Sequence, residues 1–323
     1  MILPTYLDLE AAVERTAPHI VQTPLLESLL LNRLVGGRVL VKAEPLQKTG
    51  SFKFRGASNA IWNLPDHVTH VVAYSSGNHA AAVAAAATSR GIISTIIMPE
   101  DAPAMKVANT KAFGGQVVTY NRYTENREEI GAELAKTQGA TLIPPYEYLP
   151  VIAGQGTIGI EIANHLTEQN IIPDQLICCT GGGGLIAGIS IGIHQHFPDL
   201  DIIAAEPEGF DDFKRSLELG ERVSNDPDAR SICDAIVTPM PGEMTFAINK
   251  AHVKSAAVVS DDEALMAVAT AWQYLKCVAE PGGAVALAAI LSGKVEARNK
   301  TSIVIVSGGN IDQAMFTRAL NML

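Results

Sequence analysis

A lysine flanked by two phenylalanines is the first feature of this sequence that could do chemistry. Lys53 lies between Phe52 and Phe54 in the stretch KTGSFKFRGASNA (48–60). Apolar surroundings lower the pKa of a buried lysine because they penalise the ammonium form, and a neutral amine is a nucleophile. Neighbouring side chains point in different directions, so the same spacing also allows an exposed basic face that includes Arg55.

A run of four glycines is the second feature. The stretch TGGGGLIAG (180–188) follows an apolar segment and precedes a helical pattern, so its main-chain N–H groups can surround a phosphate at a helix N-terminus. No lysine follows at the position that a Walker motif requires. Gly182, Gly184 and Ala187 also fit G-x-G-x-x-A, with Glu206 ending the next predicted strand. Taken alone, the run therefore also allows an NAD-dependent oxidoreductase.

Two further corners place polar groups between a predicted strand and a helix. The stretch SSGNH (75–79) offers hydroxyls, an amide and an imidazole that suit a carboxylate, although one such residue alone would be a helix cap. In SGGNID (307–312), Ser307 could meet an aromatic ring nitrogen, although Ser-Gly is also an ordinary turn. A lysine that forms a Schiff base, combined with a separate phosphate site, is what pyridoxal phosphate requires.

The elements that must position these residues alternate along the chain. Short β-branched runs are separated by stretches of helix length such as 78–90 and 126–138, a pattern typical of parallel sheets covered on both faces. We therefore predict a doubly wound α/β architecture, in which ligands bind at the carboxyl ends of strands. The predicted strands are 38–44, 70–74, 94–99, 116–120, 140–146, 175–179, 201–206, 255–260 and 301–307.

Overall composition limits the class of protein. The 323 residues suffice for two domains or one large α/β unit. A net charge of −10 without a local basic stripe argues against a nucleic-acid partner. No signal peptide and no apolar run long enough to cross a membrane is expected. The four cysteines lack paired CxxC spacing and are predicted to be reduced thiols of a cytoplasmic protein.

Taken together and in this order, these pieces resemble the fold-type II pyridoxal phosphate enzymes, which share a tryptophan synthase β-like architecture. Within that group the sequence is similar to the threonine/serine dehydratase and serine racemase family, over almost the whole chain. The resemblance implies two doubly wound α/β domains with mainly parallel sheets: a small domain (71–146) inserted into a large one (1–70 and 147–323). The motifs that carry it are KTGSFKFRGA, SSGNHA, PPYEYLPVIAGQGTIGIEI, GGGGLIAG, AAEPEGFDD, EPGGAVALAA and SGGNID.

The resemblance also implies roles for individual residues. Lys53 would be the Schiff-base lysine with Phe52 beside the cofactor ring, and Ser307 would face the ring nitrogen. Ser76 would be a second acid/base on the face opposite the lysine. The phosphate would be held by Gly181, Gly182, Gly183, Gly184 and Leu185; Asn78 would bind the ring hydroxyl and, with Ser75, Ser76 and His79, the substrate.

In the racemase-like branch, a divalent cation is held by residues that match Glu206, the carbonyl of Phe210 and Asp212. Such an oxygen-rich shell suits Mg²⁺, Ca²⁺ or Mn²⁺. Alternatively, the acidic pair at 211–212 only begins a helix, where anions are favoured. Arg127 matches an arginine that some relatives direct at the active-site mouth, where it could attract a second carboxylate; otherwise it is a surface arginine of a helix.

The expected activity is a β-elimination that releases ammonia from a small β-hydroxy amino acid such as threonine, serine or 3-hydroxyaspartate. The alternatives are a serine- or aspartate-type amino acid racemase with dehydratase side activity, the NAD-dependent oxidoreductase, and a non-catalytic sensor of a phosphate ligand. The segment TPMPGEMTF (238–246) replaces small polar residues of some racemase-like members, which weakens the case for racemisation. The resemblance suggests a homodimer.

Overall fold

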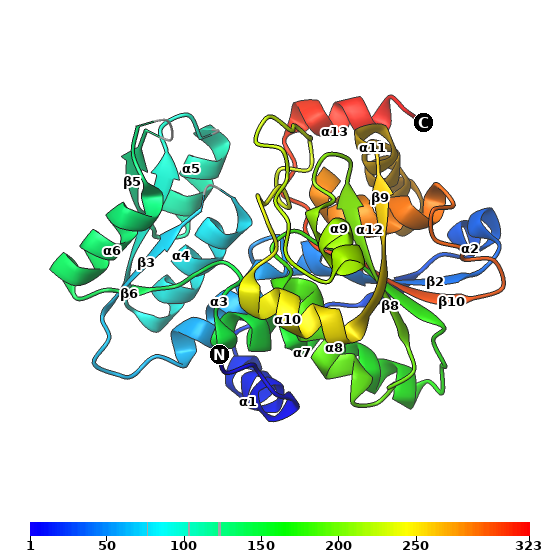
Figure 1. The fold of residues 1–323 in the computed structure, drawn as a ribbon, viewed down its shortest axis with the longest axis horizontal. Coiled ribbons are helices and arrows are strands. Elements are labelled where there is room, and N and C mark those ends of the chain that lie inside the picture. Colours follow the sequence, from blue (N-terminus) through cyan, green and yellow to red (C-terminus); the bar gives the residue numbers. More distant parts are fainter. Residues whose placement is uncertain (76, 103, 122–123) are drawn as a thin grey trace.

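The computed structural model describes residues 1–75, 77–102, 104–121 and 124–323. Two separate sheets organise the chain, one of six strands and one of four. Figure 1 shows the elements of the smaller sheet grouped on the left and those of the larger sheet on the right. This arrangement agrees with the predicted mixed α/β fold with mainly parallel sheets.

The larger sheet contains both ends of the chain and is parallel except at one edge. Only β1 runs antiparallel to its neighbour β2 among the described pairs of this sheet. The sequence analysis missed β1, because three residues are too few to show a strand pattern. In spatial order the strands are β1 (Leu25–Glu27), β2 (Arg38–Ala43), β10 (Thr301–Val306), β7 (Gln175–Cys179), β8 (Asp201–Pro207) and β9 (Val253–Val259).

The smaller sheet is built from one continuous part of the chain, and its described strand pairs are parallel. Its last strand was predicted to be longer, over 140–146, but only two residues pair, because two prolines follow at 144–145 and interrupt the ladder. The strands in spatial order are β5 (Gln116–Tyr120), β4 (Ile93–Pro99), β3 (His70–Tyr74) and β6 (Thr141–Leu142).

Helices connect the strands, as parallel pairing requires. In the large sheet, α12 contacts β7, β8, β9 and β10, while α8 contacts β7 and packs against α7. The helices are α1 (Tyr6–Thr16), α2 (Leu29–Val35), η1 (Glu44–Leu46), α3 (Lys53–Trp62), α4 (Asn78–Arg90), α5 (Ala104–Ala112), α6 (Arg127–Gln138), α7 (Leu149–Glu168), α8 (Gly184–His194), α9 (Asp212–Leu219), α10 (Glu243–His252), α11 (Asp261–Thr270), η2 (Ala271–Leu275), α12 (Pro281–Leu291) and α13 (Gln313–Leu320).

The apolar runs of the sequence form the cores of the two sheets. All five residues of β7 are buried, and so is β10 from its second residue onward. Burial of such strands on both faces stabilises the sheet and holds its carboxyl-end loops in fixed positions. In the described part of the chain, no helix is both long and apolar enough to cross a membrane.

Candidate active site

Lys53 is the first residue of α3 and the centre of the candidate site. Its Nζ donates a hydrogen bond to the carbonyl oxygen of Pro145 at 2.8 Å and lies 5.2 Å from the ring centroid of Phe52. Burial lowers the pKa of Lys53 from 10.5 to about 8, because the ammonium form loses its hydration. Among the described residues no carboxylate pairs with Lys53, so little opposes this shift. A larger share of this amine is therefore neutral near pH 7 than for an ordinary lysine.

The alternative of an exposed basic face at this lysine is wrong, because Arg55 is fully buried. Its guanidinium donates to both oxygens of Glu44, which is also fully buried, and to both oxygens of Glu161. These contacts connect the first turn of α3 to η1 and α7. A charge network thus holds the start of the helix that carries Lys53.

The glycine run between β7 and α8 presents a row of main-chain donors. Among the described residues, the N–H groups from Gly181 to Ile186 have no hydrogen-bond acceptor, although all six residues are buried. Gly183 has φ = +86°, the left-handed conformation that glycine adopts without strain. Buried donors without partners at a helix N-terminus are typical of an anion site.

Tyr146 connects the lysine to the glycine run. It follows Pro145, whose carbonyl accepts from Lys53, and its ring lies against the main chain of the run. A Cβ on Gly182 would lie 2.6 Å from the Tyr146 ring, so any side chain at position 182 would clash with that ring. The two groups that the sequence analysis expected to act on one ligand are therefore brought together.

Asn78 lies in a partly buried polar chain at the N-terminus of α4. Its Nδ2 donates to Glu280 at 2.6 Å, and its Oδ1 accepts from Asn310 at 2.7 Å. Asn310 also donates to the carbonyl of Thr49 at 2.9 Å. Burial raises the pKa of the Glu280 carboxyl to about 7. This chain joins the first turn of a small-sheet helix to three loops at the large sheet.

The other residues of the SSGNH corner differ in their surroundings. Ser75 Oγ accepts a hydrogen bond from the N–H of Gly77 at 3.2 Å. The imidazole of His79 is buried, with Nε2 bonded to the carbonyl of Ile143 at 2.9 Å and a pKa lowered to about 3 by burial. His79 is thus a neutral ring directed into the protein. Ser76 lies outside the described residues.

Ser307 follows β10 directly and is buried. Its carbonyl accepts from the N–H of Phe52 at 3.0 Å, and its own N–H donates to Gly283 at 3.2 Å. The next residue, Gly308, forms an isolated antiparallel bridge with Ser51. These contacts place the carboxyl end of β10 beside the loop that carries Lys53.

Arg127 begins α6 and is exposed. Its guanidinium lies 5.3 Å from the ring centroid of Tyr74, at the end of β3. Burial raises the pKa of Tyr146, which packs against the glycine run, and the charge of Arg127 opposes that shift. Arg127 is therefore close enough to the candidate site to influence its charge.

The acidic residues predicted to hold a cation lie together at the end of β8. Glu206 is buried and accepts from the N–H groups of Phe213 and Lys214, both at 2.9 Å, while Phe210 closes the turn before α9. Asp212 accepts from Asn225 through Oδ1, but its buried Oδ2 has no partner among the described residues. Burial raises the pKa of Asp212 to about 6 and that of Glu206 well above its usual range.

The described part of the chain contains no cluster of three or more histidine, cysteine, aspartate or glutamate side chains that could hold a metal. The predicted set does not need one, because its third ligand is a main-chain carbonyl. The unpartnered oxygen of Asp212 and the mutual repulsion of two buried carboxylates are features that a cation would relieve.

Sequence reasoning did not identify several residues that build this site. Glu280, Asn310 and Tyr146 appear in the motifs, but nothing in their spacing shows that the first two hold Asn78 or that Tyr146 packs on the glycine run. Their partners are up to 232 residues away in the chain. The one signal in the sequence was Glu280 itself, which precedes an apolar helix. A glutamate is seldom buried without a partner, so its position indicated a polar contact.

Comparison with known proteins adds independent findings. Residues 16–309 match the family described as pyridoxal-phosphate dependent enzyme. An L-threo-3-hydroxyaspartate ammonia-lyase of Saccharomyces cerevisiae is 40% identical over 324 residues, which cover 99% of this chain and 98% of that protein. A serine racemase of Schizosaccharomyces pombe is 39% identical over 323 residues, with the same shares of both chains covered.

The fold also matches solved structures. The structure of a threonine deaminase from T.th. superposes with a TM-score of 0.91 at 40% identity, covering 96% of this chain and 99% of the other. The structure of maize serine racemase gives a TM-score of 0.92 at 35% identity, covering 99% and 98%. Relatives named for different activities thus share one fold over nearly their full length.

Proposed function

The chain belongs to the family of pyridoxal-phosphate dependent enzymes, and we propose that it is an ammonia-lyase for a small β-hydroxy amino acid, with 3-hydroxyaspartate as the preferred substrate. The products would be an oxo acid and ammonia. The names of the relatives support this proposal, because hydroxyaspartate and threonine ammonia-lyases are among them. Family membership favours pyridoxal phosphate over NAD as the ligand of the glycine run.

The residues present fit this cofactor. The observation that carries the proposal is the row of unpartnered N–H groups from Gly181 to Leu185, close to a lysine whose pKa is lowered to about 8. The N–H groups would hold the phosphate, Lys53 would bond to the aldehyde, and Phe52 would lie beside the ring. Ser307 would face the ring nitrogen, and Asn78 would bind the ring hydroxyl.

Bound pyridoxal phosphate supplies an electron sink for the negative charge that develops at the substrate Cα. The protein supplies the base, because Lys53 Nζ can accept the Cα proton once it is neutral. The surrounding chain orients the carboxylate of the substrate near Ser75 and the N-terminus of α4. Enclosure by buried loops keeps water from competing for the proton.

The proposed preference for 3-hydroxyaspartate depends on Arg127. A guanidinium binds a carboxylate with two parallel hydrogen bonds, and this one lies close to Tyr74 and influences Tyr146 beside the glycine run. A second carboxylate on the substrate would find its positive charge there. Threonine and serine lack that group and should gain nothing from Arg127.

An amino acid racemase with dehydratase side activity is the second candidate, because serine racemases are also close relatives. Racemisation needs an acid/base on the face opposite Lys53, and Ser76 is our candidate for it. The bulky 238–246 segment argues against this candidate.

We further propose that Glu206, the carbonyl of Phe210 and Asp212 bind Mg²⁺, Ca²⁺ or Mn²⁺. The unpartnered Oδ2 of Asp212 supports this. Because burial raises the carboxyl pKa of Asp212 to about 6, the folded state is destabilised as pH rises from about 4 towards 6 and remains so above it. A cation should therefore raise the melting temperature more at pH 8 than at pH 5, whereas equal shifts would contradict the site.

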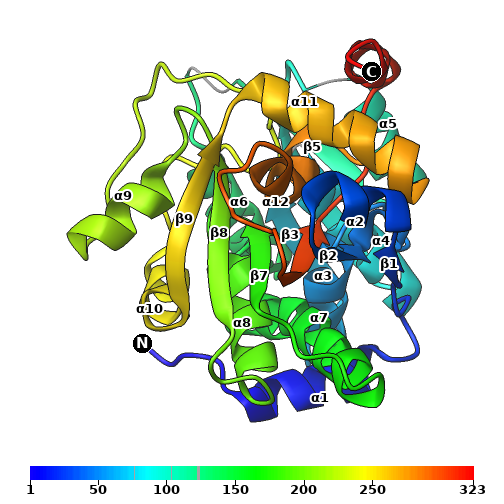
Figure 2. The same cartoon turned by 90° about the vertical axis from the view of Figure 1, so that its right-hand side faces the viewer.

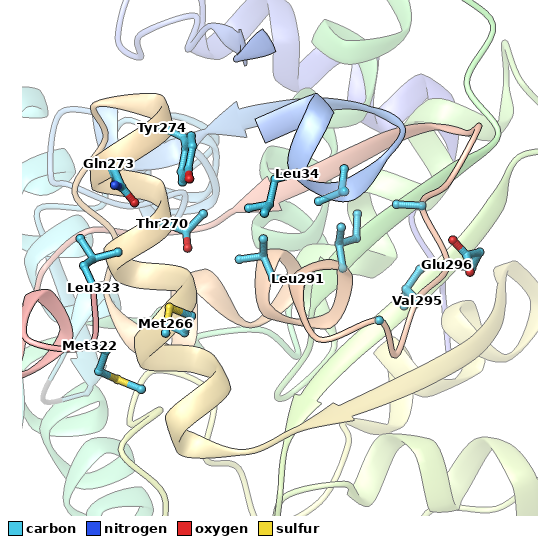
Figure 3. Close-up of a pocket in the computed structure, with 14 residues that line it drawn as sticks. Leu34, Met266, Thr270, Gln273, Tyr274, Leu291, Val295, Glu296, Met322 and Leu323 are labelled. Carbon is cyan, nitrogen blue, oxygen red and sulfur yellow. The ribbon is translucent and has the colours of Figure 1, made fainter. Parts of the chain in front are cut away.

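We propose a cytoplasmic homodimer of two-domain subunits, divided into 71–146 and the remainder, since the smaller sheet lies between His70 and Leu142. Apolar residues of α2 are exposed at one surface, including Leu29 at 72% and Leu30 at 60%. The last residues of the same helix line a cavity of about 470 Å³, together with α11, η2, α12 with the loop after it, and the C-terminal residues (Figure 3). Such a patch is typical of a protein contact.

The test is a panel of L- and D-serine, L- and D-threonine, and the 3-hydroxyaspartate diastereomers, assayed for oxo-acid release with and without EDTA. Chiral analysis of the residual amino acid distinguishes a racemase from a lyase. Arg127→Gln should lower kcat/KM for hydroxyaspartate about 10-fold or more and leave threonine unchanged. Absence of oxo-acid release from every substrate would overturn the proposal.

A further inference from the structure

We propose that α10 holds the glycine run in its anion-binding conformation through Thr245 and Asn249, which makes both of them positioning residues for the cofactor phosphate. This inference rests on the proposed assignment of the glycine run to that phosphate. Neither residue belongs to a motif that pointed to the cofactor. Both are fully buried, one turn apart on the same face of α10.

The contacts are two side-chain hydrogen bonds to consecutive carbonyls. Thr245 Oγ1 donates to the carbonyl oxygen of Gly182 at 2.6 Å, and Asn249 Nδ2 donates to that of Gly183 at 3.1 Å. The Oδ1 of Asn249 has no partner in the described part of the chain, so its single bond to the glycine run is the only one its amide makes there. In the described part of the chain, the side-chain amide of Asn249 therefore bonds to the glycine run alone.

Because of peptide-bond geometry, these contacts to carbonyls also set the direction of the N–H groups that would bind the anion. In a trans peptide the C=O and the following N–H point in opposite directions. Because α10 binds the carbonyls of Gly182 and Gly183, the N–H groups of Gly183 and Gly184 must point away from α10. Two adjacent donors are therefore directed to the same side and left without an internal acceptor.

The absence of a side chain at position 183 is what allows α10 to come so close. A Cβ on Gly183 would lie 2.8 Å from Asn249 Nδ2 and 3.0 Å from Thr245 Oγ1, closer than such atoms normally approach. The left-handed φ of +86° at this residue adds to the same requirement. Glycine is thus required at position 183 by the close approach of α10, in addition to its expected role in binding the phosphate.

The helix itself is fixed at both of its ends. At its start, Glu147 accepts from the N–H groups of Met244 and Thr245, at 3.0 and 3.1 Å. At its end, the Nδ1 atoms of His252 and His194 are 2.9 Å apart, which joins the last turn of α10 to the last turn of α8. Figures 1 and 2 both show α10 lying alongside α8.

The test measures cofactor affinity in the full-length protein after removal of bound pyridoxal phosphate. Thr245→Val and Asn249→Leu remove one neutral hydrogen bond each, so each should weaken the affinity for pyridoxal phosphate about 2- to 10-fold. Titration with pyridoxal, which lacks the phosphate, should give the same Kd for both variants and the wild type. Thr245→Ser keeps the hydroxyl and should restore the affinity for pyridoxal phosphate.

Thr16→Val is the matched control, because Thr16 is also buried and its hydroxyl bonds to a carbonyl of its own helix α1, away from the glycine run. It should leave both dissociation constants unchanged. Equal losses for pyridoxal phosphate and pyridoxal, or wild-type affinity in both variants, would overturn the inference. Failure of the wild type to bind pyridoxal phosphate would instead overturn the assignment of the glycine run.

Discussion

Two lysines of this protein have lowered pKa values but different hydrogen-bond partners. Lys42 in β2 is 2% exposed and donates to Glu161 and to the carbonyl of Thr23, both at 2.6 Å. Lys53 donates only to the carbonyl of Pro145 among the described groups. Burial lowers the pKa of both amines, but at Lys42 the carboxylate of Glu161 opposes the shift. The first lysine is paired with a carboxylate, whereas the second has no such partner among the described residues.

This difference separates a structural charge from a reactive one. Arg55 and Lys42 share Glu161, so the region between β2, α3 and α7 contains paired charges whose role is to fix the helix that begins with Lys53. A buried ion pair is costly to break because the remaining charge stays buried. An unpaired buried amine can shed its charge instead. Arg55 thus fixes the start of α3, while Lys53 in the same segment provides the base.

The largest effect is expected from Lys53→Ala. Loss of the base should lower the rate of ammonia release about 10²- to 10⁴-fold, the range typical of removing a general base. The visible absorption of attached cofactor should also disappear, while the urea midpoint stays at or above that of the wild type. Turnover at more than a tenth of the wild-type rate would show that Lys53 is not the base.

Arg55→Met should have the opposite profile. It leaves the buried carboxylate of Glu44 without its guanidinium, which typically costs about 3–5 kcal/mol in the free energy of unfolding. Urea unfolding measures this loss. Arg38→Met, which removes a partly exposed ion pair with Glu27, is the control and should cost less than about 1 kcal/mol. Similar losses of unfolding free energy in Arg55→Met and Arg38→Met would show that the buried network contributes no more than the partly exposed pair.

The pH dependence of labelling sharpens the comparison directly. With a pKa of about 8, roughly a tenth of Lys53 is neutral at pH 7, about 300-fold more than for an ordinary lysine. In the cofactor-free protein, the rate of modification of Lys53 by an amine reagent should rise with pH and level off above about 8. Mass spectrometry of the labelled peptides provides the measurement. A midpoint near 10.5 would contradict the lowered pKa.

The smallest effect is expected at a lysine paired near the surface. Lys106 of α5 forms an ion pair with Asp234, whose side chain is 54% exposed, so solvent screens their interaction. Lys106→Ala should change the free energy of unfolding by less than about 1 kcal/mol. A loss comparable with that of Arg55→Met would show that solvent exposure does not determine how much these ion pairs contribute to the free energy of unfolding.

Much of the fold follows from local patterns. The predicted strands 70–74, 116–120 and 175–179 match the structure residue for residue, because each is a short segment with β-branched residues that is set between helical patterns. The paired length of β6 was overestimated, because the two prolines at 144–145 interrupt the ladder after Leu142. Local patterns do not show which strands pair, since partners such as β2 and β10 lie far apart in the sequence.

The site shows the same limit more strongly. The glycine run and the flanked lysine could be recognised, because their residue types are unusual in those positions. The burial of Arg55 could not, since its partner Glu161 is 106 residues away. Thr245 likewise reaches Gly182 across 63 residues. Residues that bind a ligand leave local signals, whereas residues that hold those residues in place seldom do.

The four cysteines have a practical consequence for experiments on this protein. Each is free, and each exposes 3% of its surface or less. A thiol reagent in solution therefore reaches them only when the chain opens. Three of them, Cys178, Cys179 and Cys277, lie close to the ends of β7 and η2, so their rate of labelling reports opening of the large sheet without any added probe.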